Sequence, residues 1–259
     1  MLLCSVRDCH LPLTREERRL VCPRGHSFDV ARSGYINLLQ PQERRSAKPG
    51  DTAAAVAGRR RIHDLGVTEP LLNGIASMAA ATSDDVVLDA GCGEAFYLGS
   101  LGRRTGCKAF GVDISIPAID AAARRYPEDT WIVANADRFV PFADASFSLI
   151  LSITARMNAP EFRRVLHDYG RLLIAVPAPD DLVELRGPGH DRASRTIDTF
   201  AQEFTLVKQQ RVTTTADLDA TAVQDLLHAI YRPKRDQAVE AMRVTFSLDL
   251  LLFRPRPRG

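Results

Sequence analysis

The feature that most constrains the fold is a short apolar segment that runs directly into a glycine-rich turn, Val86-Val-Leu-Asp-Ala-Gly-Cys-Gly-Glu94. An apolar run of this length, bounded by glycines, is typical of a buried β-strand. We expect a helix after the turn, as far as Arg104, and then a second strand over residues 109–115 that ends in an acid. This succession predicts a β-α-β unit with parallel strands.

The same alternation continues along the chain. A helix is expected over residues 117–126 and a helical stretch over residues 216–243. Further strands are expected over residues 131–134, 147–153, 171–176, 212–215 and 244–253. Right-handed crossovers would stack the helices on both faces of the sheet. The pattern therefore predicts an α/β, Rossmann-like domain.

The ends of these strands carry the residues that indicate a ligand, because doubly wound sheets bind ligands at the carboxyl ends of their strands. Gly91 and Gly93 allow a sharp turn and a close approach of the ligand to the backbone. Asp113 ends the second strand, where a carboxylate binds both hydroxyls of a ribose. The turn lacks the helix-start glycine that cradles a pyrophosphate. A nucleoside without phosphates fits better, and S-adenosylmethionine is one.

Further cofactor contacts are expected around the same strand ends. Asp137 follows the third strand, where an acid reaches the adenine amino group, and Phe139 or Phe142 would cover the adenine face. The cofactor-binding residues predicted at this edge are Asp89, Gly91, Cys92, Gly93, Glu94, Asp113, Ile114 and Asp137. Together they indicate a methyltransferase that uses S-adenosylmethionine. The alternative is a nucleotide-binding or merely structural α/β domain.

The first forty residues hold a cluster of metal-ligand types. The predicted zinc ligands are Cys4, Cys9, Cys22 and His26. Zinc is commonly bound by three thiolates and one imidazole, and its binding provides the folding free energy of segments too short to bury a core. A hairpin of residues 12–13 and 20–21 would join the two ligand turns. His10 is a competing ligand, and unrelated cysteines in a flexible tail are the other alternative.

Charge and targeting signals suggest a compartment and a partner. The start of the chain lacks a basic segment followed by an apolar run, and no stretch approaches a membrane span in length. We expect a cytoplasmic protein, in which clustered cysteines bind metal more often than they form disulfides. The net charge is only +2, but six clustered basic residues are candidates to contact RNA phosphates: Arg44, Arg45, Lys48, Arg59, Arg60 and Arg61. The alternative is a solvated surface.

These features divide the chain into four parts. We expect a zinc-ribbon-like module over residues 1–40 and a linker with a leading helix over residues 41–69. The methyltransferase domain, of class I type, would cover residues 70–253, and residues 254–259 would form a disordered tail.

The chain resembles the bacterial 23S rRNA (guanine-N1)-methyltransferases, which include macrolide-resistance enzymes of antibiotic producers. The matching segments include Cys22-Pro-Arg-Gly-His26, Gly34-Tyr-Ile-Asn-Leu-Leu39, Leu88-Asp-Ala-Gly-Cys-Gly-Glu94 and Gly111-Val-Asp-Ile-Ser115. The resemblance implies a target at N1 of a guanine in a 23S rRNA hairpin near the peptide exit tunnel. It also implies that the zinc module helps to hold RNA and that the protein forms a homodimer.

The chain departs from the family at the cofactor site. Val67-Thr68 replaces a His-Tyr pair, and Asp181 replaces a histidine. The resemblance implies that Thr68 and Asp181 contact the methionine end of the cofactor. These departures would also fit a diverged relative with another target guanine or substrate.

The expected chemistry needs a proton acceptor, because guanine N1 carries a proton that must leave before or during attack. Asp181 and Asp137 are the candidate bases, Arg156 is placed to steady guanine O6, and Asn158 begins an Ala-Pro element that the resemblance puts at the active-site rim. Two other hypotheses stay open. One is a class I methyltransferase that acts on a small molecule, and the other is a catalytically degenerate, zinc-containing RNA-binding protein.

Overall fold

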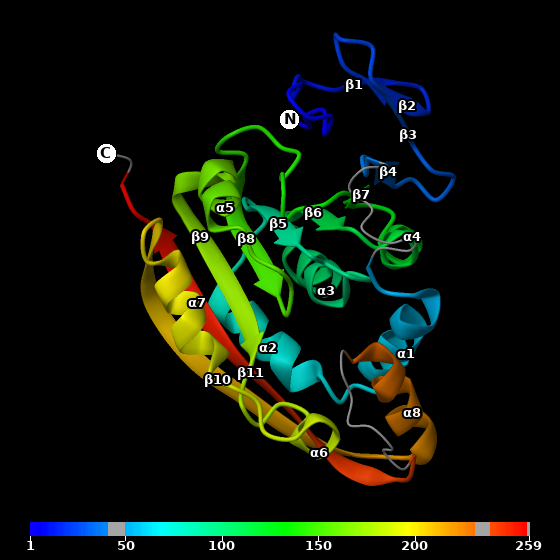
Figure 1. Ribbon diagram of the computed structural model, residues 1–259, viewed down its shortest axis with the longest axis vertical. Coiled ribbons are helices and arrows are strands. Elements are labelled where there is room, and N and C mark those ends of the chain that lie inside the picture. Colours follow the sequence, from blue (N-terminus) through cyan, green and yellow to red (C-terminus); the bar gives the residue numbers. More distant parts are fainter. Residues whose placement is uncertain (41–49, 231–238, 258–259) are drawn as a thin grey trace.

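The computed structural model describes residues 1–40, 50–230 and 239–257. An eight-stranded sheet lies at its centre, in the order β10-β11-β9-β8-β5-β6-β7-β4 (Figure 1). Neighbouring strands are parallel, except that β11 is antiparallel to both β9 and β10. The strands are β4 (Ile36–Asn37), β5 (Val86–Ala90), β6 (Lys108–Asp113), β7 (Thr130–Val133), β8 (Phe147–Ile153), β9 (Leu166–Pro177), β10 (Phe204–Leu218) and β11 (Met242–Pro255). The predicted α/β, Rossmann-like fold is confirmed.

The two faces of the sheet build two separate cores, because successive residues of a strand point to opposite faces. Val87 contributes to the core beneath α2 (Glu69–Ala79), α3 (Phe96–Thr105) and α4 (Ile116–Arg125). Its neighbour Leu88 contributes to the core on the other face, beneath α5 (Ala159–Val165) and α7 (Arg192–Phe200). Of the remaining helices, α6 (Val183–Arg186) follows β9, while α1 (Ala53–Asp64) and α8 (Ala220–Ala229) pack on each other.

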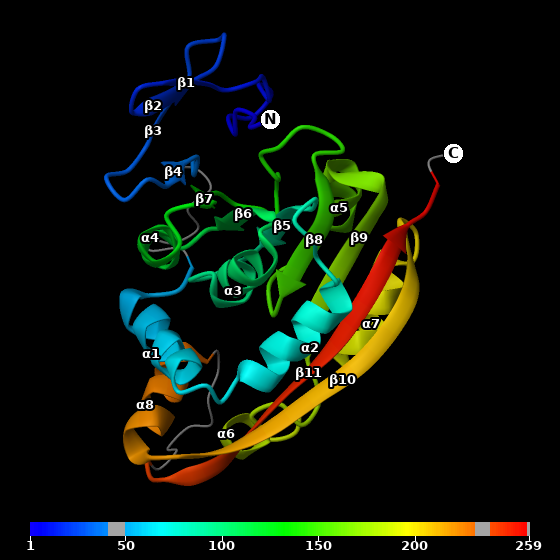
Figure 2. The same ribbon diagram turned by 180° about the vertical axis from the view of Figure 1, so that it is seen from behind.

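The N-terminal module is a small antiparallel sheet of β1 (Thr14–Glu16), β2 (Arg19–Val21) and β3 (Ser27–Asp29). Its hairpin forms as expected, although the first strand begins at Thr14 and Pro12 instead bridges to Leu3. Figure 2 shows this sheet beside β4 and β7, at the edge of the large sheet. Buried side chains of the module belong to the same apolar cluster as the second face of the large sheet. Module and domain therefore share one core.

The predicted boundary at residue 40 differs from the structure at β4. Residues Ile36–Asn37 pair in parallel with β7 and so extend the sheet of the catalytic domain. Leu38 continues the contact, since its amide donates to the Val133 carbonyl at 2.9 Å. The last residues predicted for the module therefore belong structurally to both units.

The C-terminal strands form a long hairpin that extends beyond β9. Residues 248–253 of β11 pair with β9, whereas residues 242–247 pair with β10 alone. Figure 1 shows this two-stranded arm curving past α2 toward α8, which packs against α1. We call residues 212–218 and 242–247 the hairpin arm.

Two predictions about the C-terminal third were wrong in part. Within the described residues of the segment 216–243, the expected helix covers only α8, because β10 and β11 occupy the two ends of the segment and pair with each other. Residues 231–238 lie outside the described residues. A disordered tail was expected from residue 254, but Arg254 and Pro255 belong to β11 and pair with Thr205 and Phe204.

Among the described residues, no helix is both long and apolar enough to cross a membrane.

Candidate functional site

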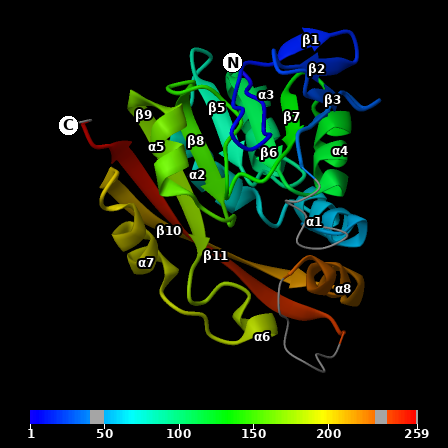
Figure 3. The ribbon, with the colours of Figure 1, turned by 45° about the horizontal axis from the view of Figure 1, so that its top comes forward.

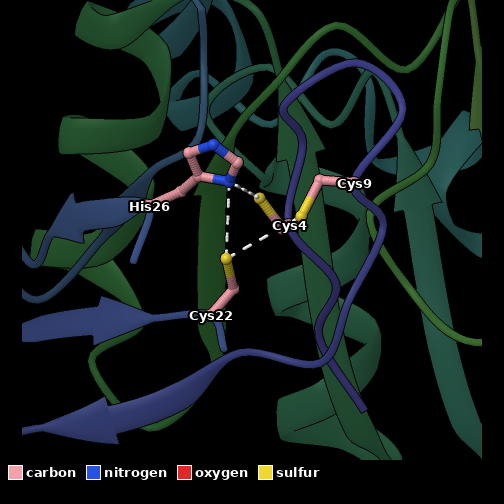
Figure 4. Close-up of side chains that lie close together, drawn as sticks. All are labelled: Cys4, Cys9, Cys22 and His26. Carbon is pink, nitrogen blue, oxygen red and sulfur yellow. Dashed lines mark hydrogen bonds between the residues drawn. The ribbon is translucent and has the colours of Figure 1, made fainter. Parts of the chain in front are cut away.

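Three cysteines and one histidine converge in the N-terminal module. Their ligand atoms, on Cys4, Cys9, Cys22 and His26, all lie within 4.8 Å of one another. The Nδ1 atom of His26 is 3.4 Å from the Sγ atoms of both Cys4 and Cys22, and the Cys9 and Cys22 sulfurs are 3.8 Å apart. Figure 4 shows the four side chains pointing toward one common point. Three thiols and an imidazole in this arrangement fit tetrahedral zinc.

Local backbone geometry explains how the ligand turns form. Asp8 and His10, on either side of Cys9, both have positive φ angles, and Gly25 (φ 82°) turns the chain between Cys22 and His26. The Cys22 amide also donates to the His26 carbonyl at 3.0 Å, which closes the second turn. His10 is not a ligand, because its ring stacks on Phe139 with the centroids 4.0 Å apart.

The module is seated on the loop that follows β7. Leu3 donates to the Pro141 carbonyl at 2.9 Å, and Leu2 forms a β-bridge with Phe142. Figure 3 shows the N-terminal segment lying over the large sheet. The prediction that Phe139 or Phe142 covers an adenine is therefore wrong. Phe142 is buried against other aromatic rings of the core, and Phe139 is occupied by His10 and by the Arg164 guanidinium.

The glycine turn after β5 lies where the sequence placed it. Gly91 has a φ of 87°, and a Cβ at that position would lie 2.3 Å from the Ala155 Cβ, so only glycine fits. Asp113 ties the turn to the end of β6. Its Oδ2 accepts from the Gly93 amide at 2.9 Å and its Oδ1 from the Ser115 amide at 2.8 Å. Burial raises the pKa of Asp113, and the two amide donors oppose that effect.

Two further carboxyl groups beside the turn have buried oxygens without a hydrogen-bond partner in the described part of the chain. Neither oxygen of Glu94, nor Oδ1 of Asp89, has a hydrogen-bond partner among the described residues. Burial, helped by the charge of Asp113, raises the pKa of Asp89 to about 8, and burial raises that of Glu94 to about 7. Orphaned buried oxygens cost free energy, so they indicate a ligand that completes them. S-adenosylmethionine fits, because its ammonium and sulfonium groups are both cationic.

Thr68 lies in a buried pair that the sequence did not reveal. Its hydroxyl is 2.7 Å from the Nδ1 atom of His63, whose ring stacks on Phe96 at 3.9 Å. Burial lowers the pKa of His63 to about 3, and the charge of Arg59 adds to this effect, so the imidazole is neutral. The one signal in the sequence was the position of His63 beside Ile62 on the apolar side of α1.

Asp181 lies on the other side of the site, after β9. Its Oδ1 accepts from the Ser247 amide at 3.0 Å, and its Oδ2 is 3.6 Å from Nη1 of Arg186. Burial raises the pKa of Asp181 to about 6. Its charge, together with burial, raises the pKa of Tyr97 in the first turn of α3. Tyr97 is a second residue that sequence reasoning missed, although it directly follows the turn.

The rim residues come together at the ends of β7 and β8. Asn158 donates from Nδ2 to the Asp137 carbonyl at 2.8 Å and caps α5 through its Oδ1. Arg156, whose side chain is 82% exposed, lies 3.4 Å from the Asp137 carboxylate. The polar atoms of Asn158 therefore hold the rim together, while the Arg156 guanidinium is open to solvent.

The three consecutive arginines of α1 do not form one basic patch. Arg59 pairs with Asp51 at 2.7 Å, Arg60 lies 3.6 Å from Asp64, and Arg61 forms a two-pronged pair with Asp225 of α8. The reason is helical geometry, which turns successive side chains about 100° apart. Arg44, Arg45 and Lys48 lie outside the described residues.

A cavity of about 380 Å³ lies between the module and the catalytic domain. Its basic lining residues are Arg7, His10, Arg138 and Arg164. Acidic groups of Asp8, Asp144 and Glu161 also line it, so its charge is mixed. The cavity connects the zinc module to the rim loop that carries Asp137.

The fold and the glycine turn define a class I methyltransferase domain that uses S-adenosylmethionine, fused to a zinc ribbon. Residues 87–174 match the family model described as a methyltransferase domain, and residues 3–47 match the one described as RlmA, N-terminal. A structure of a provisionally named methyltransferase bound to the Haloferax volcanii Trm112 activator is 18% identical, with a TM-score of 0.55 over 78% of this chain and 97% of that chain, and shows the fold alone.

Sequence relatives give the family. The 23S rRNA (guanine(748)-N(1))-methyltransferase of Streptomyces fradiae is 36% identical over 83% of this chain and 80% of its own length. A relative from Micromonospora griseorubida, provisionally named a 23S rRNA (guanine-N(1)-)-methyltransferase, is 35% identical over 71% of this chain and 68% of its own length. The chain belongs to the family of 23S rRNA (guanine-N1)-methyltransferases.

Proposed function

We propose that the protein transfers the methyl group of S-adenosylmethionine to N1 of a guanine in a 23S rRNA hairpin. The observation that carries this proposal is the family match, which extends over both the zinc ribbon and the methyltransferase domain. The shared core of the two parts supports it, because two parts that pack on each other can both contact one RNA.

Each part of the cofactor has a complementary group in the site. The cofactor supplies an electrophilic methyl group on a sulfonium. Asp113 binds the ribose hydroxyls, and Asp89 and Glu94, which have buried oxygens without a partner among the described residues, complement the cationic end. Thr68, the N-cap of α2 that is held by His63, contacts the methionine end, and the Asp137 carboxylate in the loop after β7 binds the adenine. The protein's main contribution to this displacement is to position the two reactants.

Asp181 is the proton acceptor in this proposal. A carboxyl with a pKa of about 6 is largely ionised at neutral pH yet basic enough to take part in proton transfer. Its Oδ1 is fixed by the Ser247 amide, which orients the group. Arg156, exposed at the rim, steadies the negative charge that develops on guanine O6.

The RNA is held by the module and the rim. Arg7 and Arg138, in the cavity between the module and the catalytic domain, and Arg60 on α1 contact phosphates, and the target base is presented unpaired at the rim. Because ribosomal RNA is the substrate, we place the reaction in the cytoplasm. The homodimer implied by the family is part of the proposal, and the mass of the protein in solution tests it.

A methyl-transfer assay with a defined RNA tests the proposal. The substrate is a hairpin that contains the guanine equivalent to the one named for the Streptomyces fradiae relative, and the control hairpin carries N1-methylguanosine there. We expect transfer from labelled S-adenosylmethionine to the first hairpin and none to the second.

The other outcomes separate the alternative hypotheses. Equal labelling of both hairpins would contradict N1 as the target. Cofactor binding without labelling of hairpin or intact 23S rRNA would favour a small-molecule substrate. RNA binding without cofactor binding would favour the degenerate RNA-binding protein.

A further inference from the structure

Arg59 is set against the glycine turn rather than on an open basic surface. Its Nη1 lies 3.4 Å from the point that a Cβ on Gly93 would occupy. Its side chain is 31% exposed, less than that of either Arg60 or Arg61. The guanidinium therefore lies beside the backbone that approaches the cofactor.

The surrounding chain holds this guanidinium in place. Nη1 pairs with Asp51 at 2.7 Å, and Nη2 donates to the Ala229 carbonyl at the end of α8 at 3.3 Å. Asp51 is itself fixed, because its carbonyl accepts from the Ser115 hydroxyl at 2.8 Å. Gly50 packs so closely on Ser115 that a Cβ there would lie 2.7 Å from the Ser115 Cβ. Contacts from the loop before α1 and from the end of α8 thus orient one cation at the turn.

The charges around the turn indicate which chemical groups a ligand bound there would have. Asp89 and Glu94 offer buried, unpartnered oxygens to a cationic group. Arg125 and Arg60 lower the pKa of Glu94 more than Arg59 does, but Arg59 also lowers the pKa values of Asp113 and Tyr97, so its charge reaches the whole turn. An ammonium group on the ligand would satisfy the Asp89 and Glu94 oxygens. An α-amino acid has such an ammonium, and it also has a carboxylate that could bind a nearby cation.

We infer that Arg59 binds the α-carboxylate of the methionine moiety of S-adenosylmethionine, with Asp51 holding the guanidinium in position. The fork of an arginine suits a carboxylate, and such charge-assisted bonds are about twice as strong as neutral ones. Each neighbouring arginine forms an ion pair with a carboxylate other than Asp51. Arg60 and Arg125 both pair with Asp64 at the other end of α1, and Arg61 pairs with Asp225. This inference rests on the proposed cofactor.

Calorimetric titration with two ligands tests it. One ligand is S-adenosylmethionine and the other is its decarboxylated form, which keeps the amine and the sulfonium. We expect Arg59→Ala to weaken binding of S-adenosylmethionine roughly 10- to 100-fold and to leave binding of the decarboxylated form within about twofold of wild type. Arg59→Lys should lose less affinity for S-adenosylmethionine than Arg59→Ala, because lysine keeps the positive charge although it lacks the forked guanidinium.

Arg104→Ala is the matched control. Arg104 is a half-exposed helical arginine that bonds Asn73 on the neighbouring helix, away from the turn, and its removal should alter binding of neither ligand. Thermal unfolding of every variant shows whether the fold is retained.

If Arg59→Ala weakens binding of both ligands equally, Arg59 only holds Asp51 and α8, and the inference is overturned. The same holds if neither affinity changes. Failure of the wild type to bind either ligand would instead overturn the proposed cofactor, and the inference with it.

Discussion

At the residue scale, the site is defined by buried carboxyl groups whose partners are few. Asp113 is satisfied by two backbone amides, whereas Asp89 and Glu94 have oxygens without partners in the described chain. The Asp-x-Gly-x-Gly turn and the acid at the end of β6 were readable from sequence, because local spacing determines both. The His63–Thr68 pair and the contact of Arg59 with the turn were not, because each depends on how α1 packs against α3 and on the neighbouring loop.

Removal of the Asp113 carboxylate should weaken cofactor binding. Asp113→Ala removes the carboxylate that we propose binds the ribose hydroxyls, and it releases the Gly93 amide that shapes the turn. Two charge-assisted bonds correspond to roughly a 100-fold loss of affinity for S-adenosylmethionine, measured by calorimetry. Asp120→Ala, which removes a carboxylate on α4 that pairs with Arg124 and accepts from the Ser33 hydroxyl, is the control and should bind S-adenosylmethionine normally. Unchanged binding by Asp113→Ala would remove this residue from the site.

The pH dependence of the reaction should report on Asp181. Its pKa of about 6 means that the basic form increases as pH rises through 6. The single-turnover rate of methyl transfer should therefore rise about tenfold per pH unit below pH 6 and level off above it. Asp181→Asn should lower the plateau and abolish this limb. A variant that keeps the same pH profile would show that another group takes the proton.

The pH dependence of stability should report on His63. The pKa of His63 is about 3 in the folded protein and about 6.5 in an unfolded chain, so between these values the unfolded state binds more protons. Stability from this group is therefore complete above pH 6.5 and is lost as pH falls. As pH falls from 6 to 4.5, the free energy of unfolding of the wild type should decrease by about 1.4 kcal/mol per pH unit more than that of His63→Gln. Denaturant unfolding measures this, and parallel curves for the two proteins would argue against a buried, neutral imidazole.

At the element scale, sequence patterns located the parallel strands well, since each is an apolar run bounded by turn residues. Sequence patterns located only residues 212–215 of β10, because its exposed positions carry polar side chains and its partner strand β11 lies far away in sequence. Sequence patterns also did not show that residues 36–37 join the large sheet, because β4 is only two residues long and is defined by its partner β7.

The packing of α8, the helix that follows β10, against α1 can be tested by a single substitution. A Cβ on Gly58 would lie 2.6 Å from the Asp225 carbonyl oxygen, so Gly58→Ala should push α8 away and destabilise the protein by about 1–3 kcal/mol. Gly102→Ala in α3 is the matched control. Its nearest contact would be at 3.8 Å, so better helix propensity should make it neutral or stabilising by up to about 1 kcal/mol. Equal stabilities of the two variants in denaturant unfolding would contradict this packing.

The zinc ribbon should behave as part of the domain. Because its side chains share a core with β6 and β7, removing zinc with a chelator, or through Cys22→Ser, should lower the unfolding temperature and speed hydrogen exchange in residues 139–143. Exchange in α3, on the opposite face, should change much less. Cys107→Ala, a buried cysteine outside the cluster, should keep one bound zinc per chain. Loss of zinc without any effect at residues 139–143 would mean that the module is an independent appendage.

At the scale of the whole molecule, the zinc ribbon and the catalytic domain share the apolar core on one face of the sheet. The hairpin arm extends the sheet beyond β9, where β10 and β11 pair only with each other. Sequence motifs indicated both parts and the family, because the metal ligands and the glycine turn are local. They did not indicate the cavity between module and domain, which forms only when the loop after β7 meets the N-terminal segment.

The central claim is that this protein methylates N1 of one guanine in 23S rRNA. The most direct measurement is a mass-spectrometric map of 23S rRNA methylation in cells with the gene, without it, and complemented with either the intact gene or Asp113→Ala. We predict that deletion removes a single N1-methylguanine, which the intact gene restores and Asp113→Ala does not. An identical map in all four strains would contradict the claim.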